Sequence, residues 1–363
     1  MLYFFILLAI VIIATVVFLQ SPKFGSLPKG KRLATLQQLP NYKNKQFQNI
    51  HPTPDLAEDV TYWKVLKDFI FNKNKHLKPT QPIPSKKTNL HALPINDDVL
   101  VWFGHSSYFF QTDGIKFLVD PVLSGAASPL PLSVQSFAGT DVYGVHDIPN
   151  IDYLIISHDH WDHLDYKTIK ALQPNINKVI CGWGVGAHFE KWGYTAEQII
   201  EKNWNEQFTL HQGFTINTVP ARHFSGRGLQ RNTSLWQSYA LKTPTKNIFI
   251  GGDSGYDTHF KTAGEALGPF DWAILECGQY DYSWKYIHMM PHEVLQAAAD
   301  LKATQLLPLH WGKFKLANHN WYDPIVTLTQ LSNNTIPIAT PMIGETLQLQ
   351  QTPTVQKWWE PLL

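Results

Sequence analysis

The feature that most constrains this chain is an apolar strand pattern that ends in a dense run of chelating residues. Residues 152–157 read DYLIIS, which predicts a buried strand, and HDHWDH follows at once. His158 and His160 are two residues apart, so in extended backbone their imidazoles leave on one side, and Asp162 and His163 follow on the turn. Because imidazole and carboxylate are zinc ligands, the segment predicts a metal centre. The alternative is a solvated loop.

Four ligands cannot fill two metal sites, so a binuclear centre needs further ligands downstream. Three residues directly follow apolar strand patterns: His223 after FTINTV, Asp253 after NIFI and His310 after QLLPL. Each of them alone is equally well explained as a core or turn residue with its hydrogen bonds satisfied. Their shared position at strand ends predicts that they join the HDHWDH run.

Short strand patterns alternate with helical patterns from residue 97 onward, which predicts one α/β domain with two sheets covered outside by helices. The Asp113-Gly114 pair predicts a tight hairpin turn. Strands are expected at 98–104, 107–111, 115–120, 153–157, 178–181, 214–219, 236–241, 247–250, 272–275 and 305–309. Helices are expected at 165–172, 185–192, 258–266 and 291–301.

The N-terminal segment reads differently from the rest of the chain. Residues 2–19 form an uncharged apolar run, close to the roughly 20 residues that cross a bilayer. A retained transmembrane anchor, a signal peptide and a buried core helix are the alternatives. Lys23, Lys29, Lys31 and Arg32 follow the run, which favours an anchor with its C-terminal side in the cytoplasm. The predicted organisation is an anchor at 1–20, a tether and wrapping segment at 21–96 with a helix near 59–71, and a catalytic domain at 97–363.

Charge and cysteine content exclude some classes of function. The 30 Lys and Arg balance 29 Asp and Glu, so no overall positive field would gather nucleic acid. Cys181 and Cys277 are too few for a disulfide framework, and both are expected to be buried.

The HxHxDH run, the lone histidine, the GGD at 251–253 and the late LPLHWG at 307–312 resemble the metallo-β-lactamase superfamily, whose fold is an αββα sandwich. Within it, the chain is most similar to the N-acylphosphatidylethanolamine-hydrolysing phospholipase D family and its bacterial relatives. The resemblance extends over about 101–321 and includes FGHSS at 103–107, LVDPV at 118–122, the Ala- and Pro-bearing stretch 124–131 and HWGKF at 310–314.

The resemblance implies a complete set of metal ligands for two zinc ions. One ion would be bound by three histidines and the other by an aspartate and two histidines, with a second aspartate between the ions. The implied ligands are His158, His160 and His223 for the first ion, Asp162, His163 and His310 for the second, and Asp253 as the bridge.

Three further residues gain expected roles from the resemblance. His105 and Asp120 would support the ligands by orienting imidazoles, although His105 reads equally as a core histidine. His288 would face the substrate phosphate, although it also reads as an ordinary loop histidine before a helix. The chain departs from the family at CGQY (277–280) and at His292-Glu293, which leaves the substrate less certain than the metals.

These residues predict a membrane-anchored zinc hydrolase of lipid phosphodiesters, of the phospholipase D type. Two zinc ions and two aspartates leave a cationic site that favours a phosphodiester anion, and a hydroxide bridging the ions would attack the phosphorus. Asp162 and His288 are the expected catalytic side chains. The expected partners are phospholipid and membrane, with no nucleic acid; the oligomeric state stays open. Trp284, Tyr286, Met289 and Met290 form either a rim for acyl chains or part of the core.

Other interpretations remain at this point. A lactone or carboxylic-ester hydrolase of the same fold would share the core motifs, and turnover of dispersed lipid against soluble lactone separates the two. A metal-free scaffold or DNA-handling protein would be expected to have lost some ligands. Iron or manganese is an alternative to zinc, because imidazole and carboxylate bind all three metals.

Overall fold

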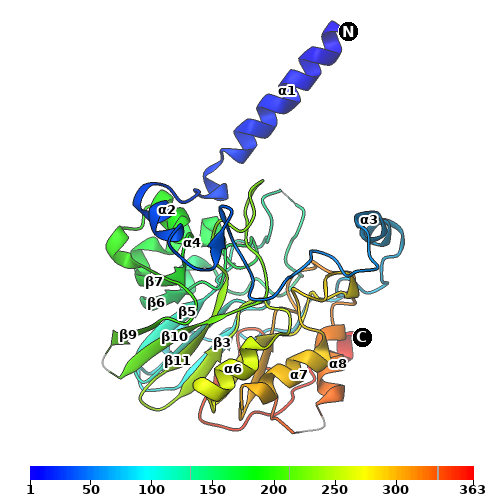
Figure 1. Ribbon diagram of the computed structural model, residues 1–363. Coiled ribbons are helices and arrows are strands. Elements are labelled where there is room, and N and C mark those ends of the chain that lie inside the picture. The colour runs from blue at the N-terminus through cyan, green and yellow to red at the C-terminus, as the bar shows by residue number, and fades with distance from the viewer. Residues whose placement is uncertain (131, 212, 333–334) are drawn as a thin grey trace.

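Two β-sheets lie face to face in the middle of the domain, and helices cover their outer faces (Figure 1). The computed structural model describes residues 1–130, 132–211, 213–332 and 335–363. The architecture is the predicted αββα sandwich. Its interior is filled by large side chains from both sheets, including Trp102, Phe117, Tyr239, Phe249 and Trp272, all of them buried.

The first sheet has seven strands in the order β15-β3-β4-β5-β6-β7-β8. Strands β15 to β5 pair antiparallel, and β5 to β8 pair parallel. The β4–β5 turn is the predicted Asp113-Gly114 pair, and both residues have the positive φ that a two-residue hairpin turn requires (49° and 79°). The strands are β3 (Val99–Trp102), β4 (Tyr108–Thr112), β5 (Ile115–Val119), β6 (Ile151–Ile155), β7 (Ile176–Gly182), β8 (Ile199–Lys202) and β15 (Thr346–Gln348).

The second sheet has six strands in the order β14-β13-β12-β11-β10-β9. Its three last strands in sequence are parallel, so their carboxyl ends share one edge. The strands are β9 (Gln207–His211), β10 (Phe214–Pro220), β11 (Gln237–Lys242), β12 (Asn247–Ile250), β13 (Trp272–Glu276) and β14 (Leu306–Leu309).

Each sheet has its own set of covering helices. Helices α4 (Tyr166–Leu172) and α5 (Gly186–Lys191) pack on the first sheet, and the Asp165 side chain caps α4 by accepting from the amide of Lys167. The second sheet is covered by α6 (His259–Ala266), α7 (Pro291–Asp300) and α8 (Asp323–Leu331).

Every strand and helix predicted from the sequence is present, with its ends shifted by a few residues at most. Among the strands and α-helices of the described residues, those that the sequence did not indicate are β8, β9, β15, α8 and the short N-terminal elements α2 (Gly30–Leu36), β1 (Tyr42–Lys43) and β2 (Gln46–Phe47). Strand β15 has three residues, too few to show a periodicity. Helix α8 reads DPIVTLTQL, and its β-branched residues weaken a helical pattern. Tertiary packing decides such elements.

The N-terminal segment has two contrasting parts. Helix α1 (Leu2–Leu19) is long and apolar enough to cross a membrane, none of its residues is buried, and it extends away from the domain (Figure 1). One apolar helix could therefore anchor the protein in a membrane. Residues 21–96 lie along the domain instead and bury Leu36, Phe47, Ile83 and Leu90. Helix α3 (Tyr62–Phe71), in the same segment, has no buried residue.

Candidate metal centre

The predicted metal ligands converge on one edge of the two sheets. The HDHWDH run follows β6, and the three isolated residues follow β10, β12 and β14. All of these side chains are buried or nearly so because strand ends from both sheets meet there. They form two groups, which we call the histidine triad (His158, His160 and His223) and the mixed group (Asp162, His163 and His310), with Asp253 between them.

The histidine triad presents three ring nitrogens to one point. His160 Nδ1 lies 2.9 Å from His158 Nε2 and 3.2 Å from His223 Nε2. Nitrogens bound to zinc at about 2.0–2.1 Å in a tetrahedron lie roughly 3.3 Å apart, so this spacing fits the metal. Burial lowers the pKa of all three histidines, which favours the neutral, metal-binding form. His223 Nδ1 donates to the Ile287 carbonyl (2.9 Å), which fixes the ring with Nε2 inward.

The mixed group brings a carboxylate together with two imidazoles. Asp162 Oδ2 lies 3.5 Å from His163 Nε2 and 4.0 Å from His310 Nε2. His310 Nε2 and Asp253 Oδ1 are buried and find no hydrogen-bond partner among the described residues. Buried polar atoms rarely stay unpartnered, so these two atoms also fit a bound cation.

Asp253 lies between the two groups. Its Oδ2 is 3.1 Å from His163 Nε2 and 3.8 Å from the Nε2 atoms of both His158 and His223. Its Oδ1 is 3.2 Å from His310 Nδ1, but the two atoms do not have the geometry of a hydrogen bond. Burial raises the pKa of Asp253, but the charges of His163 and His310 outweigh it and hold the pKa well below the usual range. This is the position that a bridging ligand needs.

The two residues expected to support the ligands touch them. Asp120 Oδ2 accepts from His163 Nδ1 (2.8 Å), which leaves His163 Nε2 facing Asp253. His105 Nε2 lies 2.9 Å from Asp162 Oδ2. His105, Asp120 and His310 all have positive φ (54°, 41° and 69°), a backbone conformation that costs energy and is concentrated at functional sites.

His288 lies beside both groups and is paired with a residue that the sequence analysis missed. Its ring is 5.1 Å from that of His223 and 5.3 Å from that of His310. His288 Nδ1 lies 2.7 Å from Glu276 Oε2. Burial alone lowers the pKa of His288, but the charge of Glu276 raises it to about 9; burial raises the pKa of Glu276 to about 7. Glu276 is the last residue of strand β13 and directly follows the apolar run 272–275. A search for chelating residues at the ends of apolar strands, which found Asp253, would therefore have found Glu276 too.

A pocket of about 310 Å³ opens over the centre. Ligands of both groups and His288 line its floor, while Phe224, Trp284, Ile287 and Leu316 add apolar wall. Of the four residues considered for an acyl rim, only Trp284 lines the pocket; Met289 is buried in the core. Residues 277–280 (CGQY), where the chain departs from the family, include Gln279, which lines the pocket. The side-chain oxygen of Gln279 accepts from the amides of Leu316 and Ala317.

Asp159, in the middle of the HDHWDH run, points away from the metal ligands. Its carboxylate accepts from the Gly226 amide (2.7 Å) and the Ser234 hydroxyl (2.6 Å), and it pairs with His188 (3.1 Å). Arg227 donates to the Asp159 carbonyl (2.8 Å). This network, which the sequence analysis missed, holds the ligand loop. The two cysteines are buried, as expected, and take no part in the centre.

Comparison with known proteins identifies the family and agrees with the fold. The sequence model of the "Beta-lactamase superfamily domain" matches residues 116–311, more than half of the chain. The uncharacterized protein Rv0906 of Mycobacterium tuberculosis is 34% identical over 331 residues, 90% of this chain and 89% of that protein. N-acyl-phosphatidylethanolamine-hydrolyzing phospholipase D 1 of Caenorhabditis elegans is 33% identical over 240 residues, 61% of this chain and 65% of the worm protein.

A solved structure has the same fold. Igni18, a metallo hydrolase of the archaeon Ignicoccus hospitalis, superposes with a TM-score of 0.54 at 20% identity, over 69% of this chain and 98% of the archaeal chain. The resemblance seen in the sequence is thereby confirmed. The chain belongs to the metallo-β-lactamase superfamily of metal-dependent hydrolases and is related to the N-acylphosphatidylethanolamine-hydrolysing phospholipases D.

Proposed function

We propose that the protein is a binuclear zinc hydrolase of the phospholipase D type that cuts N-acylphosphatidylethanolamine or a closely related lipid phosphodiester. The observation that carries the proposal is the position of Asp253 between two groups of ligand atoms, on the floor of a pocket that also contains His288. The histidine triad would hold one ion, the mixed group the other, and Asp253 would contact both.

The charge of the occupied site favours an anionic substrate. Two zinc ions carry four positive charges, and the carboxylates of Asp162 and Asp253 remove two, so the pocket floor keeps a net positive charge. His288 also lines the pocket and pairs with Glu276, so a protonated imidazole there would add to this charge. A phosphodiester anion fits this floor better than a neutral ester does.

The protein's own residues would orient the reacting groups. Zinc, when bound, polarises phosphoryl oxygens and lowers the pKa of water toward about 7. Asp162, held by His105, is placed to orient the attacking water. His288 is placed to donate a hydrogen bond to a phosphate oxygen, with Glu276 on its other nitrogen. No side-chain nucleophile is needed.

A lipid substrate is favoured by three features. The worm relative is named for hydrolysis of N-acylphosphatidylethanolamine. The pocket walls include apolar side chains from Phe224, Trp284, Ile287 and Leu316, which would contact the lipid near its headgroup. Helix α1 would hold the domain at the membrane, where the local concentration of lipid is high. The basic residues after α1 favour a cytoplasmic domain.

The test uses the full-length protein in mixed micelles with N-acylphosphatidylethanolamine, followed by mass spectrometry of the products and metal analysis. Phosphatidic acid and N-acylethanolamine should form with the native protein and not with His160→Ala. Absence of turnover in protein that carries two zinc ions would contradict this substrate. Hydrolysis of a lactone under the same conditions would instead identify the alternative reaction class.

A further inference from the structure

Helix α3 presents an apolar face to solvent. Trp63, Leu66 and Ile70 recur at helical spacing, and Phe71 follows; Trp63 is 79% exposed and Phe71 76% exposed. None of the residues of α3, all of which the structure describes, is buried. The opposite side of the helix rests on the pocket wall, where the Phe69 ring lies 6.0 Å from that of Trp284. No described residue of the chain buries this apolar face.

Further exposed apolar side chains lie beside the base of α1. Leu132 is 85% exposed and Leu229 is 86% exposed, each in a loop. Both loops contact Lys23, the fourth residue after α1. Its Nζ donates to the Pro129 carbonyl (2.7 Å), and its own carbonyl accepts from Arg227 (2.9 Å). These loops are thus on the side of the domain where α1 departs.

The base of α1 is fixed to the domain rather than freely jointed. The carbonyls of Pro22 and Gly25 accept from Trp192 Nε1 (2.8 Å) and Lys191 Nζ (2.7 Å). The Ser26 amide donates to His188 Nδ1 (3.0 Å), and the other ring nitrogen of His188 faces Asp159 of the ligand loop. Residues 22–26, which follow α1, are therefore linked through His188 to the loop that contains the metal ligands.

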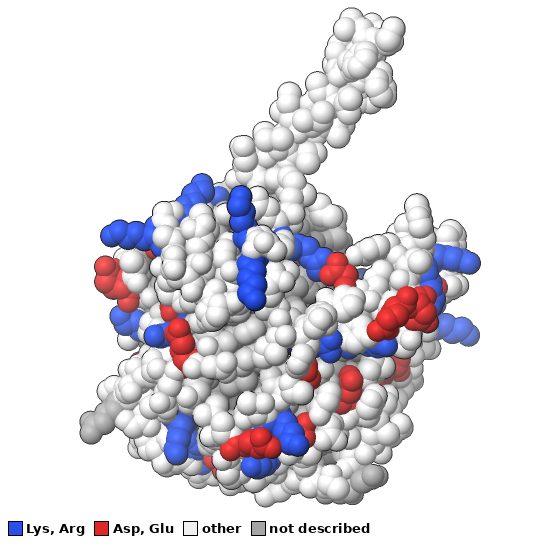
Figure 2. Space-filling model, in the orientation of Figure 1, with Lys and Arg blue, Asp and Glu red and all other residues white. Residues whose placement is uncertain are grey.

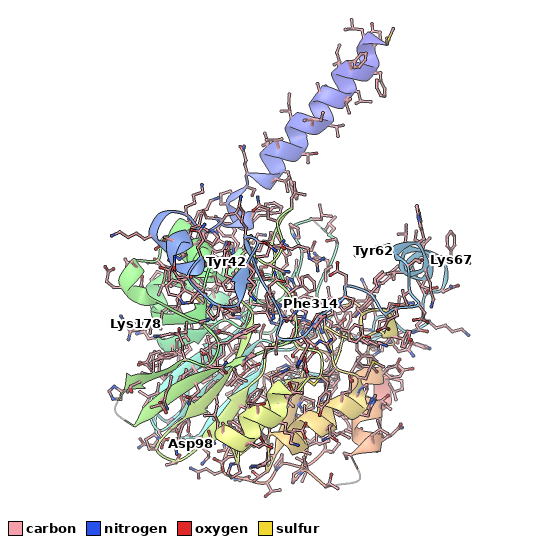
Figure 3. The ribbon with its side chains drawn as sticks, viewed as in Figure 1. Tyr42, Tyr62, Lys67, Asp98, Lys178 and Phe314 are labelled. Carbon is pink, nitrogen blue, oxygen red and sulfur yellow. The ribbon has the colours of Figure 1, made fainter. Side chains whose placement is uncertain are left out.

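The pocket opens between α3 and the loop that contains Leu229. Tyr62 at the start of α3 and Arg231 both line it, and both contact Asp55, at 3.0 Å and 2.9 Å. Figure 3 labels Tyr62 and Lys67 on α3, at the end of the domain from which α1 extends. The exposed face of α3, the loops and the pocket mouth thus share one side of the molecule.

Charge on this side suits a lipid surface. Residues 64–78 contain Lys64, Lys67, Lys73, Lys75 and Lys78 against one acidic residue, Asp68. The acidic residues just before α3, Asp55, Glu58 and Asp59, face Arg231, Lys285 and tyrosine hydroxyls instead. Figure 2 shows basic side chains at the base of α1, and both basic and acidic side chains around α3. An exposed helix with aromatic and aliphatic residues on one face and lysines beside them is the pattern of helices that lie in the headgroup region of anionic membranes.

We propose that α3 lies in the interface of the same bilayer that α1 enters, so that the pocket opens onto the lipid surface. The proposal rests on the membrane location of α1 but not on the reaction catalysed. A second copy of the chain is a less suitable occupant of the α3 face, because α1, the exposed loops and the lysines all lie on the side where the bilayer would be.

The test places a fluorescent probe on α3 in the full-length protein. Trp63→Cys and Phe71→Cys provide the labelling sites, and the two native cysteines are buried and should not react. Glu265→Cys on α6 is the matched control, exposed and far from α1 in Figure 1. In vesicles of phosphatidylethanolamine and phosphatidylglycerol, nitroxide-labelled lipid should quench the probes at 63 and 71 and leave the probe at 265 unchanged.

Two outcomes would overturn the proposal. Equal, weak quenching at all three sites, in protein shown by flotation to be inserted through α1, would mean that α3 stays in water. Protection of residue 63 by cross-linking to a second copy, without lipid quenching, would assign the face to a dimer. As a second readout, Trp63→Glu with Phe71→Glu should reduce membrane-surface quenching at a probe on residue 66, independently of any activity.

Discussion

The two halves of the metal centre are built differently. The histidine triad consists of three imidazoles whose pKa values burial lowers; the Ser157 hydroxyl holds the ring of His158, and the Ile287 carbonyl holds that of His223. The mixed group is surrounded by carboxylates: burial alone would lower the pKa of His163, but Asp253 and Asp162 raise it well above the usual value, and Asp120 is bonded to its other nitrogen. The first half therefore offers neutral donors to a metal ion, and the second offers negative charge that a dication would neutralise.

This difference teaches that the two ions should be held by different means. In the triad, affinity should depend on nitrogen donors that suit zinc. In the mixed group, it should depend on charge and on buried residues that hold the ligands in place. Asp253 lies between the two halves, so its replacement is the first test of whether the two ions are held by different means.

Replacement of Asp253 should have the largest effect. Asp253→Ala removes the side chain between the groups, so both ions should be lost and turnover should fall roughly 10³-fold or more. Asp257→Ala, in the same loop and paired with His51 instead, is the control. Metal analysis and product release are the measurements. Two retained ions with full turnover would show that Asp253 is not a bridge.

Single ligand changes should separate the halves. His160→Ala removes a donor of the triad and His163→Ala a donor of the mixed group, so each should reduce the metal content from about two ions to about one. Native mass spectrometry counts the ions, and cobalt substitution shows from its absorption spectrum which ligand environment remains. Identical spectra from the two variants would contradict the division into two groups.

His288→Gln should reduce activity without removing metal. The amide cannot be protonated, so it would lose the charged hydrogen bond that His288 would donate to the phosphate, and turnover should fall by roughly 10²-fold, as for loss of a charged or hydrogen-bonding group at the transition state. Both ions should stay bound. His292→Gln, exposed and four residues further on, is the control. Loss of metal from His288→Gln would instead place His288 among the ligands.

The smallest effect is expected at Asp120. Asp120→Asn keeps the shape but loses the charge beside His163, so the affinity of the mixed group should weaken by about 10–100-fold while the triad keeps its ion. Competition with a chelator of known affinity measures each site. Equal weakening of both sites would mean that Asp120 acts on the whole edge of the sheets rather than on one half.

The sequence by itself determined the parts of this protein that depend on local pattern. Apolar runs predicted the strands, and chelating residues directly after them predicted the ligands, because strand ends in a two-sheet sandwich meet at a shared edge. The Asp113-Gly114 turn and the apolar helix α1 were equally local. Even Glu276 was within reach of this rule, because it ends β13.

Only the tertiary structure decided which polar side chains meet. Asp159 and Asp162 are three residues apart in the same run, yet one points to His188 and the other to His105. The pairing of Glu276 with His288 depends in the same way on how the chain returns after β13. The exposed face of α3 depends on which side of that helix meets Trp284. These contacts join segments distant in sequence, and no periodicity along the chain encodes their partners.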